Sequence, residues 1–348
     1  MMDDVLPFPL LALVGQPELK MALILGLINP QIGGVLISGP YGVGKTTAVR
    51  GLLDLMPKVE RVWEDAEGHA HTAHEPMRLV ELPLNARLED VVGGINQRVA
   101  IEQQRVLLEE GILFHAHRNV LYVDEINLLD PVVVEAILDA AAQGRTLVRR
   151  GPMTRLFPSQ FVLIGSMNPQ EGELRPQILD RFGLRVWVAP LEDPRGRLDA
   201  YRRSRDFRAD PSAFRTAYAA QTAALAEEVE AAREILPHVE TPPRLEELTM
   251  NLVQALQVPS QRAESALLEA ARARAAADFR NLVSDEDIRR IAPMALRQRH
   301  SLQIDAFARS YAEERASIDA ALATLLAAPT PPSPRRKPST VHKIEGEG

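Results

Sequence analysis

The strongest constraint on this chain is an eight-residue segment that matches the phosphate-loop pattern G-x-x-x-x-G-K-[ST] completely. It consists of Gly39, Pro40, Tyr41, Gly42, Val43, Gly44, Lys45 and Thr46. An apolar run at 35–38 precedes it, and a helical run beginning at Thr47 and reaching residue 55 follows. Glycines let backbone N–H groups turn toward a phosphate, and the next helix offers the same anion its positive N-terminus. A ligand-free glycine turn is the alternative, but the complete pattern in this context favours ATP binding.

Two acidic residues end a second apolar run. Asp124 and Glu125 follow the run 120–123 about 80 residues after the phosphate loop. We predict that Thr46 and Asp124 hold Mg²⁺, and that Glu125 polarises the attacking water while Lys45 contacts the β- and γ-phosphates. Taken alone, the same two acids could equally cap the next helix.

Asn168 ends a third run, at 161–165 followed by Ser166 and Met167. Carboxyl ends of parallel strands meet at one edge of a sheet, so we expect Asn168 beside the phosphate loop. Its amide would bond the attacking water or the γ-phosphate. The alternative is a turn asparagine, since Asn-Pro opens turns.

The first 190 residues alternate short apolar runs with helical patterns, which predicts an α/β domain with a five-stranded parallel sheet. The predicted strands are 35–38, 78–82, 120–123, 161–165 and 184–188. Residues 191–328 show no strand pattern and predict an all-helical domain of four or five helices, one of them starting at Ser284. The proline-rich segment 329–348 predicts a disordered tail.

Composition excludes several classes of protein. The chain has no cysteine and no apolar run long enough to span a membrane, and its acidic start lacks the basic region of a signal peptide, so we expect a cytoplasmic protein. A formal net charge of −7 and an aromatic content of 5% count against a nucleic-acid partner.

With these motifs the sequence resembles AAA+ ATPases of the clade that contains the ATPase subunit I of magnesium chelatase and the MoxR-like ATPases. The resemblance covers residues 8–299 and is most specific at 121–129 (LYVDEINLL) and 165–184 (GSMNPQEGELRPQILDRFGL). The phosphate loop is closer to general AAA+ usage than to that of the chelatase subunits, and the segment 57–77 looks shorter than theirs.

The resemblance implies further roles. Arg181 would be the arginine finger that reaches a neighbour's nucleotide, and Asp180 would orient it or bridge the interface. Arg262 would be the lid arginine that touches the γ-phosphate, and Val14 and Gly15 would form the adenine side of the site. Without the resemblance, Arg181 and Arg262 would be read as ordinary surface arginines.

The resemblance also implies insertions at 85–118, extending a helix with a projecting element, and at 144–160, where two arms around Gly151-Pro152 predict a hairpin. Its arginines would face a ring pore or solvent. His69, His71 and His74 lie in the segment 57–77, which we expect to be a solvated loop rather than a metal site.

The function implied is that of an ATP-driven homo-oligomeric ring, expected to be a hexamer, that serves a magnesium chelatase. Its partners would be an adaptor with AAA+-like and von Willebrand factor A-like domains and a large porphyrin-binding subunit. A MoxR-like remodelling or metal-insertion ATPase and a nucleic-acid motor of the same clade are the alternatives.

Overall fold

The computed structural model describes residues 6–64, 69–95, 102, 107–150, 153–299, 313 and 315–320. The chain forms two units, Met1–His300 and Ser301–Gly348, and the fold below is that of the first. The predicted tail at 329–348 lies outside the described residues, as does most of 301–328. No helix in the described part is long and apolar enough to cross a membrane.

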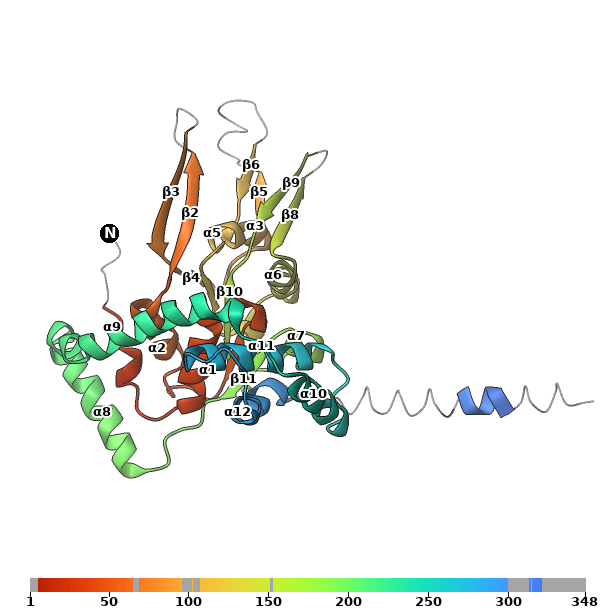
Figure 1. The fold of residues 1–348 in the computed structure, drawn as a ribbon. Coiled ribbons are helices and arrows are strands. Elements are labelled where there is room, and N and C mark those ends of the chain that lie inside the picture. The colour runs from red at the N-terminus through yellow and green to blue at the C-terminus, as the bar shows by residue number, and fades with distance from the viewer. Residues whose placement is uncertain are drawn as a thin grey trace, which may run out of the picture. The chain divides into compact units, whose positions relative to one another are not determined.

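A five-stranded parallel sheet forms the centre of the first unit, as predicted (Figure 1). Its order is β11-β1-β10-β7-β4, and neighbouring strands are all parallel. The strands are β1 (Val35–Ser38), β4 (Leu79–Leu82), β7 (Val120–Val123), β10 (Val162–Met167) and β11 (Leu184–Trp187). The three middle strands β1, β10 and β7 are buried along their whole length, which explains their unbroken apolar runs.

Alternate residues of these strands build two cores, one on each face of the sheet. Val35 and Ile37 pack into a core with α1 (Pro17–Ile28) and α11 (Arg262–Ala277). Leu36, between them, packs into a second core with α6 (Pro131–Gln143). The sheet is therefore covered on both faces.

Short helices complete the α/β part. They are α2 (Lys45–Arg50), α3 (Leu88–Val92), α5 (Ile112–His115), α7 (Pro176–Leu179), and the 3₁₀ turns η1 (Leu10–Ala12), η2 (Pro30–Ile32), η3 (Gly51–Leu55) and η4 (Ile126–Leu128). The single helix expected from Thr47 to Leu55 is thus wrong in its second half. The α-helix gives way to a 3₁₀ turn at Gly51, a residue that disfavours helix interiors.

Three two-stranded ribbons project on the same side of the sheet (Figure 1). They are β2 (Lys58–Glu64) with β3 (Ala70–Pro76), β5 (Gly93–Ile95) with β6 (Leu108–Glu110), and β8 (Arg145–Arg150) with β9 (Met153–Pro158). The hairpin predicted at 144–160 is confirmed. The projecting element expected at 85–118 is the ribbon β5–β6, which lies between the short helices α3 and α5 in the chain, and the tip of this insertion lies outside the described residues.

The first ribbon corrects the loop expected at 57–77. Residues Lys58–Glu64 and Ala70–Pro76 pair as antiparallel strands. His71 and His74 are three residues apart on one strand, so they belong to opposite faces of the ribbon. No cluster of three potential metal-ligating side chains occurs in the described ranges of the chain.

The helical part contains five α-helices within residues 194–296, as predicted. They are α8 (Pro194–Ala209), α9 (Pro211–Ile235), α10 (Pro243–Ala255), α11 and α12 (Asp285–Leu296), with the 3₁₀ turn η5 (Leu236–His238). The predicted start at Ser284 is confirmed, because its hydroxyl and the Asp287 carboxylate form a capping box. Alanines of α11 pack against α1 in the first core, so the two parts share one hydrophobic interior.

Candidate nucleotide site

The phosphate loop leaves β1 at its carboxyl end and enters α2. Gly42 and Gly44 have φ angles of 72° and 88°, which side chains rarely adopt, and a Cβ on Gly39 would lie 2.5 Å from the Val188 carbonyl oxygen. The Lys45 ammonium crosses the loop and donates to the carbonyl oxygens of Gly39, at 2.6 Å, and Pro40, at 3.0 Å. The loop therefore has the backbone conformation and the cation that a phosphate requires.

Oxygen ligands for a hard cation lie next to the loop. The Thr46 hydroxyl is 3.1 Å from the Asp124 carboxylate, which ends β7. Tyr122 donates to the same carboxylate at 2.8 Å, and Ser166 of β10 donates to it from the other side. Two hydroxyl groups therefore fix the orientation of Asp124 toward Thr46.

Glu125 and Asn168 complete this edge of the sheet. Glu125 has a φ of 49°, and its backbone N–H donates to the Ser166 hydroxyl at 3.1 Å. Asn168 is 1% exposed, and its oxygen accepts from the Gln170 N–H at 3.2 Å. The Asn168 amide nitrogen is buried and has no hydrogen bond of acceptable geometry in the described part of the chain.

These residues fit a nucleotide with Mg²⁺. The buried Asn168 amide nitrogen interacts with the Tyr41 hydroxyl of the phosphate loop but makes no hydrogen bond of acceptable geometry in the described residues. A phosphate oxygen or a bound water there would satisfy it, because leaving such a donor unsatisfied costs about 1–3 kcal/mol. A hydroxyl and a carboxylate are the ligands that Mg²⁺ takes in phosphate sites.

Val14 and Gly15, which are expected to form the adenine side of the site, lie just before α1. A Cβ on Gly15, whose φ is 68°, would lie 3.0 Å from the Leu191 side chain. The Gln16 amide donates to the Ala189 carbonyl at 2.7 Å, and Val14 lies near Gly196 of α8. The structure thus brings Val14 and Gly15 to the end of β11, next to the strand that carries the loop.

Burial and neighbouring charges shift the pKa values of two residues at this edge. Partial burial and the nearby carboxylates of Glu171 and Asp124 raise the pKa of Glu125, while Lys45 opposes the shift. Burial lowers the pKa of Lys45, against the attraction of the same carboxylates. A base must be ionised to accept a proton, so Glu125 loses this capacity at a higher pH than an ordinary glutamate.

This shift gives a testable pH dependence. If Glu125 is the base, kcat falls as the pH drops through its raised pKa. Glu171→Gln removes a negative neighbour, lowers that pKa and moves the acid limb of the kcat profile to lower pH. Glu173→Gln, an exposed carboxylate without this effect, is the control. ATPase profiles at saturating MgATP measure both, and an unmoved limb in Glu171→Gln would contradict the assignment.

Arg181 lies at the opposite edge of the sheet. It precedes β11, whose Leu184 pairs with Val35 at the start of β1, and its carbonyl lies beside Gly33. The run from Val35 to Gly39 is about 13 Å long at about 3.3 Å per residue, so the strand separates Arg181 from the phosphate loop of its own chain. The Arg181 guanidinium forms an ion pair with Asp139 of α6.

Arg262 lies at the same opposite edge, not at the phosphate loop of its own chain. Its guanidinium is 3.7 Å from the Asp180 carboxylate. The Asp180 carboxylate accepts from Arg299 and Ser260, both at 2.7 Å, and not from Arg181, so it does not orient Arg181 by a direct bond, while its bridging of an interface stays a prediction. Arg181 and Arg262 therefore lie at the opposite edge of the sheet from Lys45, Thr46, Asp124, Glu125 and Asn168.

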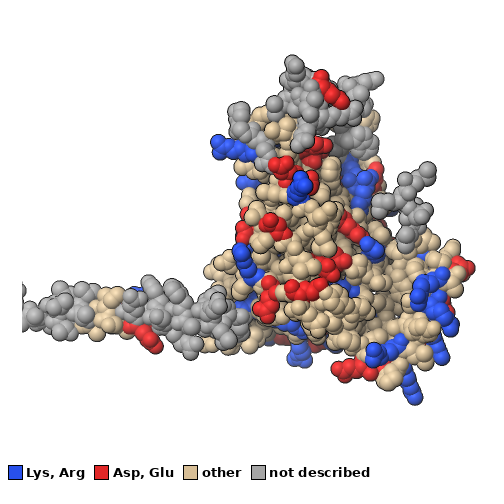
Figure 2. Space-filling model, turned by 180° about the vertical axis from the view of Figure 1, so that it is seen from behind, with Lys and Arg blue, Asp and Glu red and all other residues tan. Residues whose placement is uncertain are grey.

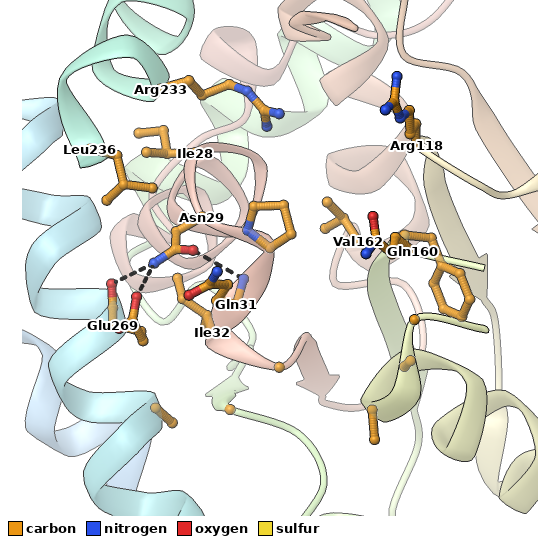
Figure 3. A pocket seen from close by; sticks show the side chains of 18 of the residues that line it. Ile28, Asn29, Gln31, Ile32, Arg118, Gln160, Val162, Arg233, Leu236 and Glu269 are labelled. Carbon is orange, nitrogen blue, oxygen red and sulfur yellow. Dashed lines mark hydrogen bonds between the residues drawn. The ribbon is translucent and has the colours of Figure 1, made fainter. Parts of the chain in front are cut away.

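A cleft of about 1150 Å³ opens at this edge. Arg181 and Arg262 belong to its lining. Figure 3 shows another part of it, where Ile32 and Leu236 lie on one side and Val162 on the other. The Asn29 amide donates to the Glu269 carboxylate at 2.7 Å and ties α11 to the α/β part there.

Sequence reasoning missed three contributors to the site. The Tyr122 and Ser166 hydroxyls orient Asp124, and Asp139 pairs with Arg181. Tyr122 and Ser166 each place a hydroxyl group in an otherwise apolar strand. This feature of the sequence could have indicated that they contribute to the site. Nothing in the sequence around Asp139 indicates its partner, 42 residues away.

Surface charge is unevenly distributed. Helix α8 carries six arginines against two aspartates and contains no fully buried residue. From behind, Figure 2 shows basic side chains gathered at the lower corner where this helix lies, while acidic and basic side chains mix over the rest of the face. No continuous basic surface of the kind that tracks a nucleic acid is visible on that face.

The fold and site define an AAA+ ATPase. An AAA domain of the dynein-related subfamily matches residues 34–182, and an AAA lid domain matches residues 247–322. A solved putative ATPase of Cytophaga hutchinsonii, 21% identical, shares the fold with a TM-score of 0.59 over 88% of this chain and 90% of its own.

Within this class, the chain is similar to proteins that are named as magnesium-chelatase subunits. The chain is 39% identical over 310 residues to a magnesium-chelatase subunit ChlI homolog of Methanocaldococcus jannaschii, covering 84% of this chain and 85% of the relative. It is 38% identical over 338 residues to the magnesium-chelatase 38 kDa subunit of Acidiphilium rubrum, covering 91% and 97%. The chain belongs to the family of the magnesium-chelatase ATPase subunit I.

Proposed function

We propose that this chain hydrolyses MgATP to drive Mg²⁺ insertion into protoporphyrin IX, as the motor subunit of a magnesium chelatase. Its relatives are named as subunits, which supports work in a larger complex. The proposed partners are an adaptor with AAA+-like and von Willebrand factor A-like domains and a large subunit that binds the porphyrin. The inserted Mg²⁺ is a substrate, distinct from the Mg²⁺ that accompanies ATP.

Each residue at the carboxyl edge has a proposed role. Lys45 and the loop N–H groups bind the phosphates, and Thr46 and Asp124 hold Mg²⁺, which neutralises charge on the phosphates. Glu125 accepts the proton of the attacking water, and the Asn168 amide orients that water or the γ-phosphate. Little covalent chemistry is needed, because positioning and charge supply the catalysis.

The observation that carries the proposal is the division of the site between two edges of the sheet. The loop, the acids and Asn168 lie at one edge, and Arg181 and Arg262 at the other. An arginine fork suits a phosphate, but neither guanidinium faces the loop of its own chain. We infer that both arginines act on the nucleotide of the neighbouring subunit, which requires a head-to-tail ring, proposed to be a hexamer.

A shared site makes assembly depend on nucleotide. We expect ATP or a non-hydrolysable analogue with Mg²⁺ to shift this chain from small species to a ring, because the γ-phosphate joins two subunits through Arg181. Sedimentation velocity at micromolar protein, with and without the analogue, measures the shift. Lys45→Ala, which weakens nucleotide binding, should need a higher concentration of the analogue for the same shift. A monomer under both conditions would argue against the shared site.

A reconstitution experiment distinguishes the proposed chelatase function from the two alternative functions. Mixed with the adaptor and porphyrin-binding subunits of a magnesium chelatase, this chain should support ATP-dependent formation of Mg-protoporphyrin, followed by fluorescence. Failure there, with ATPase activity intact, would favour a MoxR-like role on another von Willebrand factor A-domain partner. Stimulation of the ATPase by DNA would instead favour a nucleic-acid motor, which the formal net charge of −7 disfavours.

A further inference from the structure

The guanidinium of Arg299, just after α12, is fully buried and completely bonded. Its side chain is 0% exposed. Its Nε donates to the Ala295 carbonyl of α12 at 2.6 Å. The two terminal nitrogens donate to four oxygens of a distant segment: the carboxylate and carbonyl of Asp180, at 2.7 and 3.3 Å, and the carbonyls of Phe182 and Gly183, at 3.0 and 3.2 Å. All five N–H groups of a guanidinium are thereby used.

These oxygens flank Arg181 on both sides. Asp180 precedes it and Phe182 follows it, so one side chain from the helical part grips the backbone around Arg181. A second contact comes from the turn before α11, where the Ser260 hydroxyl donates to the other Asp180 oxygen at 2.7 Å. The helical part therefore holds both oxygens of the Asp180 carboxylate.

Regular structure does not fix Arg181 itself. It lies between the four-residue helix α7 and the start of β11 at Leu184. Its side chain is 29% exposed and pairs with Asp139, whose side chain is 55% exposed. Exposed ion pairs contribute about 1 kcal/mol or less, so the backbone anchor is the stronger determinant of where Arg181 points.

We infer that Arg299 is the positioning residue for Arg181. Through Arg299, the helical part of one subunit fixes the position of the arginine that acts on the nucleotide of its neighbour. The inference rests on the proposed sharing of the site. Lysine has three donors without a planar fork, so it cannot reproduce this set of bonds. A misplacement of about 1 Å can reduce a rate by about a hundredfold, so losing the anchor has a catalytic consequence.

The test uses Arg299→Met, which keeps length and removes all five donors. The variant retains an unaltered phosphate loop, so we expect it to bind MgATP normally and to lose hydrolysis by about a hundredfold. Mixed with Lys45→Ala chains, it should regain activity, because its own phosphate loop then meets a correctly held Arg181 from the neighbour. Mixed with Arg181→Ala chains, it should regain none, since both variants lack the same function.

Arg280→Met is the matched control. Arg280 also makes a two-pronged ion pair within the helical part, at 2.7 and 2.8 Å to the buried Asp287, but it does not contact the segment around Arg181. The Arg280→Met variant should have a lower unfolding temperature. It should not show a loss of ATP hydrolysis that Lys45→Ala chains rescue and Arg181→Ala chains do not. If Arg299→Met does not assemble, Arg299→Lys is put through the same mixtures with the same expected pattern.

The mixtures distinguish the positioning role of Arg299 from the sharing of the site between subunits. Recovery in the Arg181→Ala and Lys45→Ala mixture, but not in the Arg299→Met and Lys45→Ala mixture, overturns the positioning role and leaves the shared site intact. Recovery of Arg299→Met by Arg181→Ala, or near wild-type activity of Arg299→Met alone, also overturns it. No recovery in the first mixture, with co-assembly confirmed, instead refutes the shared site itself.

Discussion

Two inactive variants, Arg181→Ala and Lys45→Ala, are expected to recover ATP hydrolysis when they are mixed. Arg181→Ala has an intact phosphate loop and should bind ATP, but the neighbouring site loses a charge worth about a thousandfold or more in comparable enzymes. Lys45→Ala has an intact Arg181 and a weakened phosphate site. Where a loop from the first variant meets Arg181 from the second, a complete site forms.

Random mixing of the two variants sets the expected size of the recovered ATPase activity. In a random equal mixture, roughly a quarter of the head-to-tail interfaces combine the intact loop with the intact arginine. ATPase activity should therefore rise well above that of either variant alone and remain below that of the unaltered chain. Steady-state phosphate release measures it, and sedimentation confirms co-assembly.

An arginine acting within its own chain cannot be rescued in this way, because no subunit of the mixture has both groups. Co-assembled rings without recovery would therefore contradict the division of the site between two edges of the sheet. Arg175→Ala is a useful comparison, since Arg175 lies near Arg181 in sequence but has a 64% exposed side chain, 3.8 Å from Glu135. It should keep most of the activity.

Glu125→Gln is expected to separate binding from chemistry. The carboxylate accepts a proton from water in the transition state and contributes little to binding of the ground state, so the loss falls on kcat. A positioned base contributes roughly a hundredfold to ten-thousandfold, and we expect a loss in that range with the affinity for MgATP nearly unchanged. Nucleotide titration and single-turnover hydrolysis measure the two quantities.

The matched comparison is Glu171→Gln. Glu171 is an exposed carboxylate close enough to raise the pKa of Glu125, so this variant removes a charge from the same edge without removing the base. It should keep substantial activity. Near wild-type turnover in Glu125→Gln would show that another group accepts the proton.

Features that depend on neighbouring residues in the chain were predicted from the sequence. Strands β1, β7 and β10 are buried on both faces and therefore appear as unbroken apolar runs, and Lys45, Asp124 and Asn168 follow their carboxyl ends. Parallel pairing brings those ends to one edge, so the nucleotide side of the site could be assembled from pattern alone.

The ribbon β2–β3 was not predicted, because its sequence lacks such an apolar pattern. Most described side chains of its strand β3 are exposed, so the strand carries no apolar alternation. Its histidines were close in sequence, but the two-residue period of a strand places His71 and His74 on opposite faces.

The sequence by itself determined the parallel sheet and the phosphate-loop motif with the acids that follow the next strand, and from these it predicted nucleotide binding. Only the tertiary structure decided where Arg181 and Arg262 lie, because their position follows from which end of β11 pairs with β1 and from how the helical part packs. The anchoring of Arg181 by Arg299 joins residues more than a hundred positions apart through bonds to backbone carbonyls. Every residue has a backbone carbonyl, so no sequence pattern records which one a buried arginine selects.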